Sequence, residues 1–146
     1  MKALLTIAMV AILVAMVSAN PGSKTDYLVT KDGKVIVADV HFGFFRIHAK
    51  TSEDLCTKIS YSDVVSYTKD GETYFKKPLF NDNKCADCEV FMRLVSWRNG
   101  LGLYCYEDPS LDSKSNKRYF IFKDETTLWL EVSPRNAETI RNFFSK

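Results

Sequence analysis

Short segments rich in Val, Ile, Tyr, Phe and Thr recur along most of the chain, and residues that favour turns separate them. The clearest separators are Asp32-Gly33, Asp70-Gly71, Asn99-Gly100 and Asp124-Glu125. Asn-Gly is the strongest hairpin signal because both of its residues accept a positive φ. The pattern predicts about eight to ten short strands joined by tight turns, so neighbouring strands are mostly antiparallel. The predicted strands are residues 27–30, 35–40, 42–47, 56–60, 64–68, 72–75, 90–97, 101–106, 119–122 and 127–132.

Such a meander leaves two exposed edges, and closing the sheet into a barrel removes both. A mostly β fold with a closed or nearly closed antiparallel barrel is therefore the predicted architecture. The Asn99-Gly100 turn places Arg98 opposite Leu101 and fixes which side chains share a face. The face predicted to point into the barrel carries Val90, Met92, Leu94, Ser96, Leu101, Leu103 and Cys105. The face predicted for the outer wall, or for a contact under a helix, carries Phe91, Arg93, Val95, Trp97, Tyr104 and Tyr106.

The period of the pattern changes at the end of the chain. Ser133 is a suitable helix N-cap, and Pro134 is a suitable first helical residue. Apolar residues then recur on one face of a short helix. We expect this face to pack on the barrel rather than on a membrane, because the polar face has little basic charge. The apolar residues are Ala137, Ile140, Phe143 and Phe144.

The start of the chain has the pattern of a cleavable secretory signal peptide. Lys2 gives a positive start, residues 3–17 carry no charge, and Ser18 and Ala19 close the segment with small residues. The apolar core is shorter than the roughly 18 to 20 residues that cross a bilayer, and no later segment is long and apolar enough. We therefore expect a signal peptide at residues 1–19 and a single secreted, extracellular domain at residues 20–146, with no membrane span.

The charge balance excludes a nucleic-acid partner. The chain has 20 Lys and Arg against 18 Asp and Glu, and no dense basic stripe. Nucleic-acid-binding proteins need such a stripe or a recognisable module. The one local excess of basic residues is diluted by Ser, Asn and Asp, so we interpret it as a solvated loop. Its members are Lys114, Lys117 and Arg118.

All four cysteines follow the predicted cleavage site: Cys56, Cys85, Cys88 and Cys105. In an oxidising compartment two disulfides are the expected state, and three pairings are formally possible. The register across the Asp70-Gly71 turn brings Cys56 close to Cys85, which favours that pair and leaves Cys88 with Cys105. A metal centre on the Cys85 and Cys88 pair would need a second cysteine pair or paired histidines. The chain does not supply either, so neither a metal nor a cofactor is predicted.

The two histidines give the closest approach to a catalytic arrangement. These are His41 and His48. Asp39 and His41 alternate on one predicted strand and so share a face, as a base and its orienting group would. No Ser or Cys in a recognisable nucleophile motif accompanies them. The sequence therefore predicts that the protein is not an enzyme.

A strand-borne Cys56, the Asp70-Gly71 hairpin and Cys85-Ala86-Asp87-Cys88 followed by an apolar strand occur in this order. Residues 119–122 and the terminal helix come after them. This arrangement resembles the orosomucoid-type lipocalins, especially their fish tributyltin- and saxitoxin-binding branch. The resemblance implies a secreted calyx of about eight strands that carries a small hydrophobic molecule.

Two functions of different classes are therefore predicted. In the first, the protein is lipocalin-like and binds a small apolar ligand inside the barrel, since a barrel of about eight strands can hold one. The residues predicted to contact this ligand are Val90, Met92, Leu94 and Leu103. In the second, a venom, mucus or defence protein binds another protein through its surface and holds no internal ligand. The residues predicted for this surface are Arg93, Trp97, Tyr104 and Tyr106.

Overall fold

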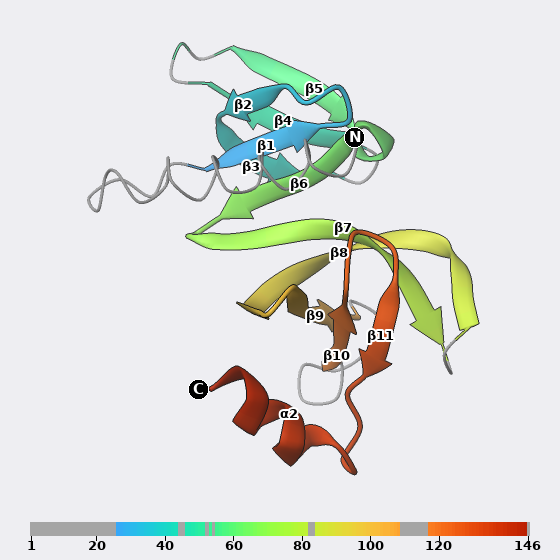
Figure 1. The fold of residues 1–146 in the computed structure, drawn as a ribbon. Helices are drawn as coiled ribbons and strands as arrows, with labels where there is room; N and C mark the ends of the chain where they lie inside the picture. Colours follow the sequence, from blue (N-terminus) through green and yellow to red (C-terminus); the bar gives the residue numbers. More distant parts are fainter. Residues whose placement is uncertain are drawn as a thin grey trace.

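The computed structural model describes residues 26–43, 46–51, 53, 55–81, 84–108 and 117–145. The predicted signal peptide at residues 1–19 and the basic residue Lys114 lie outside these ranges. The described residues form eleven β-strands, one short 3₁₀ helix and one α-helix, and the strand pairs among them are antiparallel. The prediction of a mostly β, antiparallel fold with a C-terminal helix is confirmed (Figure 1). No helix in these ranges has the length and apolar character to cross a membrane.

The strands form two sheets. The large sheet contains β1 (Tyr27–Thr30), β2 (Val35–Val37), β6 (Val64–Lys69), β7 (Glu72–Asn81), β8 (Lys84–Arg98), β9 (Leu101–Glu107), β10 (Lys117–Phe122) and β11 (Leu128–Glu131). Its strand order is β11-β10-β9-β8-β7-β6-β1-β2. The small sheet, in the order β3-β4-β5, contains β3 (Asp39–Phe42), β4 (Arg46–Lys50) and β5 (Cys56–Ser60). The 3₁₀ helix η1 (Tyr61–Asp63) leads into β6, and α2 (Ala137–Phe144) follows β11.

The long β7–β8 pair crosses the middle of the molecule. In Figure 1, β1, β2, β6 and the small sheet lie above this pair, whereas β9, β10, β11 and α2 lie below it. Both β7 and β8 are therefore shared between an upper and a lower half of the fold.

The predicted turns at Asp70-Gly71 and Asn99-Gly100 are confirmed. Both residues of each turn have positive φ, 54° and 82° in the first and 50° and 77° in the second. Positive φ at both positions is the type I′ geometry, whose twist matches that of paired strands. Between β10 and β11, the Asp124 carboxylate builds the turn by accepting from the backbone N–H groups of Thr126 and Thr127, at 2.9 and 2.7 Å.

Two segments that were predicted as single strands are not continuous strands in the structure. The strand predicted at residues 35–40 is divided at Ala38, whose N–H donates to the carbonyl of Asp26 at 3.1 Å, so β2 and β3 join different sheets. The strand predicted at residues 42–47 spans the connection between β3 and β4. There the N–H of Gly43 donates to the carbonyl of Arg46 at 2.9 Å. The sequence has apolar residues on both sides of this connection, so its pattern resembles that of one continuous strand.

The register of the β8–β9 hairpin departs from the prediction at one residue. Arg98 pairs with Leu101, as predicted, but Leu94 pairs with Tyr104 rather than with the residue after it. Val95 is therefore an extra residue on β8, which is a β-bulge. Side chains alternate between the two faces of a strand. One extra residue on β8 therefore reverses which side chains of β8 and β9 share a face beyond the bulge.

The bulge overturns the predicted grouping of side chains on β9. Tyr104 and Tyr106 lie on the same face as Met92, whereas Leu103 and Cys105 lie on the other face with Arg93. The predicted face is therefore wrong for these four residues of β9.

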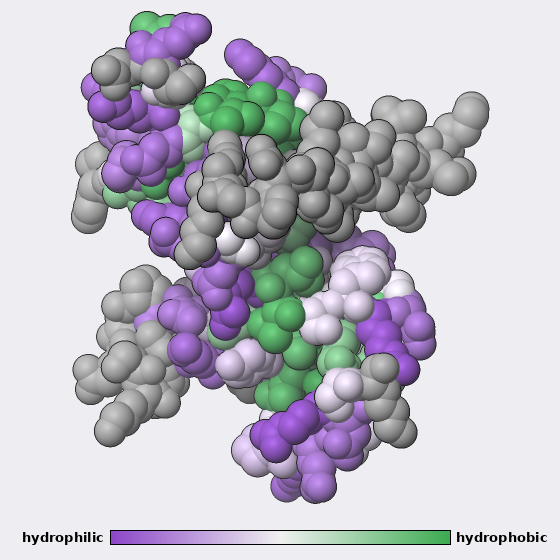
Figure 2. All heavy atoms as spheres, turned by 90° about the vertical axis from the view of Figure 1, so that its left-hand side faces the viewer, coloured by the Kyte–Doolittle hydropathy of each residue, from purple (hydrophilic) through white to green (hydrophobic). Residues whose placement is uncertain are grey.

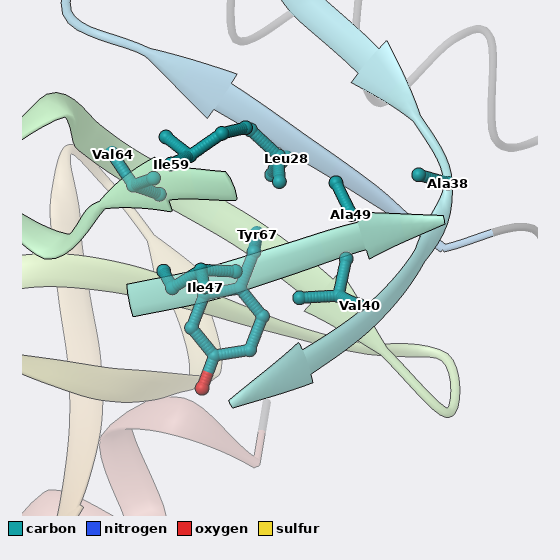
Figure 3. Packing of buried hydrophobic residues seen from close by; sticks show 8 residues of the cluster. All are labelled: Leu28, Ala38, Val40, Ile47, Ala49, Ile59, Val64 and Tyr67. Carbon is teal, nitrogen blue, oxygen red and sulfur yellow. The ribbon is translucent and has the colours of Figure 1, made fainter. Parts of the chain in front are cut away.

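A first apolar cluster lies between the two sheets. Figure 3 shows its side chains pointing toward one another from β1 and β6 of the large sheet and from the small sheet. Its buried members are Leu28, Ala38, Val40, Ile47, Ala49, Ile59, Val64 and Tyr67. On the large sheet, Tyr67 pairs with Tyr74 and Tyr74 with Arg93, so this cluster occupies the face that also carries Cys105.

A second apolar cluster lies on the opposite face of the large sheet. Phe75 follows Tyr74 on β7 and pairs with Met92, so both side chains point away from the first cluster. The buried members of this second cluster are Met92, Tyr104, Phe120 and Phe122. Partly buried side chains packed against them are Phe75, Leu79, Phe80, Val90, Leu94, Tyr106 and Leu128.

Neither sheet closes into a barrel in the described part of the chain, because β11 and β2 end the order of the large sheet and no pairing joins them. The predicted barrel closure is therefore not confirmed. The lower half of the sheet curls over the second cluster, and side chains join parts that are not paired as strands. Arg118 on β10 donates to the carbonyl of Phe80 at 2.6 Å and to the side chain of Asn81 at 2.8 Å, both at the end of β7.

The helix α2 starts later than predicted. Ser133 does not cap it: the backbone N–H of Asn136 donates to the Ser133 carbonyl at 3.1 Å, and Asn136 is the residue that precedes the helix. Ile140 is buried, as predicted. Arg98 of β8 donates to the carbonyl of Phe143, and its guanidinium lies 5.1 Å from the centre of the Phe143 ring. The helix therefore packs against the end of β8.

Arg118 and Lys117 were predicted in a solvated loop, but they begin β10 and give a matched pair of variants. Arg118 also donates to Glu131 from two nitrogens, at 3.0 and 2.8 Å, with both side chains mostly buried. We expect Arg118→Ala to lower the free energy of unfolding by about 2 kcal/mol, measured by urea denaturation, because a partly buried carbonyl and a carboxylate lose their donors. Lys117→Ala, which removes only an exposed pair with Glu107 at 3.2 Å, should change it little. Equal losses in the two variants would contradict this role of Arg118.

Candidate functional site

The candidate site is the concave face of the curled sheet, which the second cluster lines. Tyr104 lies at its centre, with ring centres 6.0 Å from Phe75 and 5.7 Å from Phe122, in edge-to-face arrangements. Phe122 also lies 6.1 Å from Phe80 and 6.4 Å from Phe120. Burial raises the pKa of Tyr104 to about 12, so its hydroxyl is neutral at physiological pH. The wall is therefore aromatic and apolar, and it carries no ionised tyrosine.

This wall is not fully covered by the protein. Four side chains of the second cluster are buried, while the seven packed against them keep part of their surface exposed. On the face in Figure 2, hydrophobic side chains gather in the middle of the lower half, with hydrophilic ones around them. Apolar surface of this half of the molecule therefore reaches solvent.

One charged side chain lies inside this apolar surface. Lys77 is only 3% exposed, and its ammonium lies 4.7 and 5.1 Å from the ring centres of Tyr104 and Phe122. The ammonium donates to the backbone carbonyls of Asp124 and Glu125 at 3.0 and 3.1 Å. Burial lowers the pKa of Lys77 to about 8, and the nearby carboxylates of Glu125 and Asp124 oppose this effect. Lys77 therefore ties the turn after β10 to β7.

Three of the four residues predicted to contact an apolar ligand meet on this wall. Met92 is fully buried in the second cluster, and Val90 and Leu94 pack against it. Leu103 does not join them, because the bulge at Val95 turns it to the opposite face.

The four residues predicted for a protein-binding surface do not share one. Tyr104 is 3% exposed and Tyr106 packs against the second cluster, because the bulge turns both inward. Arg93 is on the opposite face, where it donates to Glu72 at 3.1 Å. Trp97 alone of the four is strongly exposed, at 57%.

The four cysteines are free thiols in the structure, so the predicted disulfide pairing stays a prediction. Cys56, Cys85 and Cys88 are exposed. Cys105 is buried, and burial raises the pKa of its thiol, while a hydrogen bond with Tyr119 opposes this. Within the described ranges, no three His, Cys, Asp or Glu side chains gather in a way that could hold a metal ion.

Asp39 and His41 share a face of β3, as predicted, with 2.9 Å between the carboxylate and Nε2 of the imidazole. Both side chains are more than half exposed. His41 pairs across the strands with His48, whose Nδ1 lies 3.9 Å from the sulfur of Cys56. These groups belong to the small sheet, whereas the second cluster lies on the large sheet.

Sequence reasoning missed Lys77 and most of the aromatic wall. A signal for Lys77 was present, because strand alternation places residue 77 on the same face as Phe75 and Leu79. The predicted strand, however, ended at residue 75, before Pro78. Pro78 is accommodated because β7 pairs with β6 only up to Phe75, so beyond that point one edge of β7 needs no donor.

No protein-family model, curated protein or solved structure matches the chain. The resemblance to orosomucoid-type lipocalins therefore rests only on the residues that carry it. The case for a functional site depends on the geometry of the second cluster.

The buried ammonium makes stability depend on pH. In the unfolded chain Lys77 keeps its proton up to its ordinary pKa of 10.5, whereas in the fold it loses the proton near pH 8. Between these values the unfolded state binds more protons, so the fold gains stability as pH rises. We expect the free energy of unfolding to increase by about 1–2 kcal/mol from about pH 7.5 to about pH 9.5.

The control is a neighbouring lysine. Lys77→Met should lose most of this increase, whereas Lys76→Met, which alters a lysine on the opposite face of β7 whose pKa burial lowers less, should keep most of it. Urea denaturation across the pH range measures both variants. An increase that persists in full in Lys77→Met would show that Lys77 is not its source.

Proposed function

We propose that the protein is a secreted, non-catalytic binding protein that takes up a small apolar molecule on the concave face of the curled sheet. The observation that carries the proposal is an aromatic, apolar wall of which seven side chains remain partly exposed. Small-molecule sites are typically lined in this way, with a few polar groups for orientation. A ligand placed there would remove further apolar surface from water, which favours its binding.

The proposal keeps the expected location and architecture as parts of the same hypothesis. A signal peptide at residues 1–19 would deliver the chain to the extracellular space, where two disulfides would form. A lipocalin-like calyx would be completed if the curled half of the large sheet closed further around its ligand. The ties from Arg118 to Phe80 and from Lys77 to the turn after β10 already join parts of the chain that are not paired as strands.

Two leucines on opposite faces of the β8–β9 hairpin test this proposal. We expect the uncharged fluorescent probe N-phenylnaphthylamine to bind the wild type and to bind Leu94→Ala roughly fivefold more weakly, since about 1 kcal/mol of apolar contact is lost. Leu103→Ala, on the opposite face, should bind it like the wild type. Fluorescence titration gives the affinities, and circular dichroism checks that the variants fold. No uptake by the wild type, or equal losses in both variants, would refute the proposal.

A second candidate is binding of another extracellular protein. It is favoured by the exposure of both tryptophans, Trp97 at 57% and Trp129 at 49%, since exposed Trp is common in binding hot spots. Neither tryptophan is a buried core residue, so their replacement should leave the thermal transition nearly unchanged.

The test of the second candidate is partner capture. A double variant, Trp97→Ser with Trp129→Ser, should lose a partner that the immobilised wild type captures from extracellular fluid, identified by mass spectrometry. Leu55→Ser removes a side chain of similar exposure, 61%, from the upper half and should keep the partner. Capture that survives the double variant would exclude the two tryptophans as the binding residues.

A further inference from the structure

Lys77 is a buried cation that forms no ion pair in the described part of the chain, although the carboxylates of Glu125 and Asp124 act on it at longer range. Among the ion pairs of the described residues, none includes Lys77. An ammonium has three N–H donors, and the structure gives acceptors for two of them, the carbonyls of Asp124 and Glu125. A buried charge is costly unless it is both hydrogen-bonded and paired. The third N–H of the ammonium is therefore the position that a negative acceptor would fill.

The surroundings of Lys77 define what such a group would be attached to. Its ammonium lies over Tyr104 and Phe122, which belong to the wall of the second cluster. Lys77 pairs across the strands with Val90, which packs on the same wall. A ligand that reaches Lys77 from the exposed part of this wall must therefore be apolar over most of its length and carry its negative charge at one end.

We infer that the molecule bound by the second cluster is an amphiphile with one acidic headgroup, of the class of long-chain carboxylic acids, and that Lys77 receives this headgroup. The inference rests on the proposed function, whose ligand it specifies. The carboxylate accepts the third N–H of the ammonium, and the chain lies along the aromatic wall. Charge-assisted hydrogen bonds are stronger than neutral ones, especially at low dielectric.

The turn after β10 takes part in this arrangement. Lys123, Asp124, Glu125, Thr126 and Thr127 are all exposed, and this turn holds Lys77 through main-chain carbonyls only. The carboxylates of Asp124 and Glu125 attract the ammonium electrostatically. Tyr104 is the titratable group that lies beside it on β9. A bound carboxylate would share the ammonium with the two carbonyls or displace one of them.

The experiment compares hexadecanoic acid with its methyl ester as competitors of N-phenylnaphthylamine at pH 7. The two have the same chain but only the acid has a charge. We expect the acid to bind the wild type about tenfold more tightly than the ester, which corresponds to a hydrogen bond to a charged group. Lys77→Met should abolish this preference, Lys77→Arg should keep part of it, and Lys76→Met should leave it unchanged. Because burial lowers the pKa of Lys77 to about 8, the preference of the wild type should also fall as pH rises through that value.

Each result decides between the two proposals. If the wild type binds neither the probe nor the two competitors, the proposed function fails. If the probe binds but the acid and the ester compete equally, or neither competes, binding of an apolar molecule is supported. The inference that Lys77 receives an acidic headgroup is then refuted. A preference that survives in Lys77→Met would assign the charge recognition to another cation. The acid-to-ester comparison on the wild type needs no variant, so it decides even if Lys77→Met does not fold.

Discussion

The structure depends on one pair of strands that serves two apolar clusters. Tyr74 and Phe91 on β7 and β8 pack on the first cluster, while the next residues along the chain, Phe75 and Met92, pack in the second. Strand alternation makes this possible, because adjacent side chains point to opposite faces. The β7–β8 pair is therefore covered on both faces. Neither half of the fold can be removed without exposing one apolar side of these strands.

This shared pair also explains why the large sheet does not need to close. A closed barrel encloses one interior, but the described chain has two apolar clusters on opposite faces of the same sheet. The small sheet covers the first, and the curl of the lower half surrounds the second. The edges are short: β2 has three residues and β11 has four. Short edge strands are one of the ways in which open sheets avoid pairing with other chains.

Local turn chemistry made much of the fold predictable from the sequence. Asp70-Gly71 and Asn99-Gly100 have the positive φ values that their residue types favour, and the strands around them follow. The bulge at Val95 was not predictable, because nothing in an alternating apolar segment marks where one residue is left unpaired. This bulge determines which side chains of β9 belong to the candidate site. It turns Tyr104 and Tyr106 toward the second cluster and Leu103 away from it. The division at Ala38 was likewise hidden, since it depends on a hydrogen bond to Asp26, distant from any turn signal.

Lys77 places a buried positive charge beside the otherwise apolar side chains of the second cluster. A Met or Leu at this position would occupy similar space without the cost of removing a charge from water. The ammonium instead holds the turn after β10 through the carbonyls of Asp124 and Glu125, so it links the position of that turn to the interior of the curl. Any group that competes for the ammonium acts on the turn as well. Under the proposed function, recognition of a negative headgroup by Lys77 would therefore be coupled to the position of this turn.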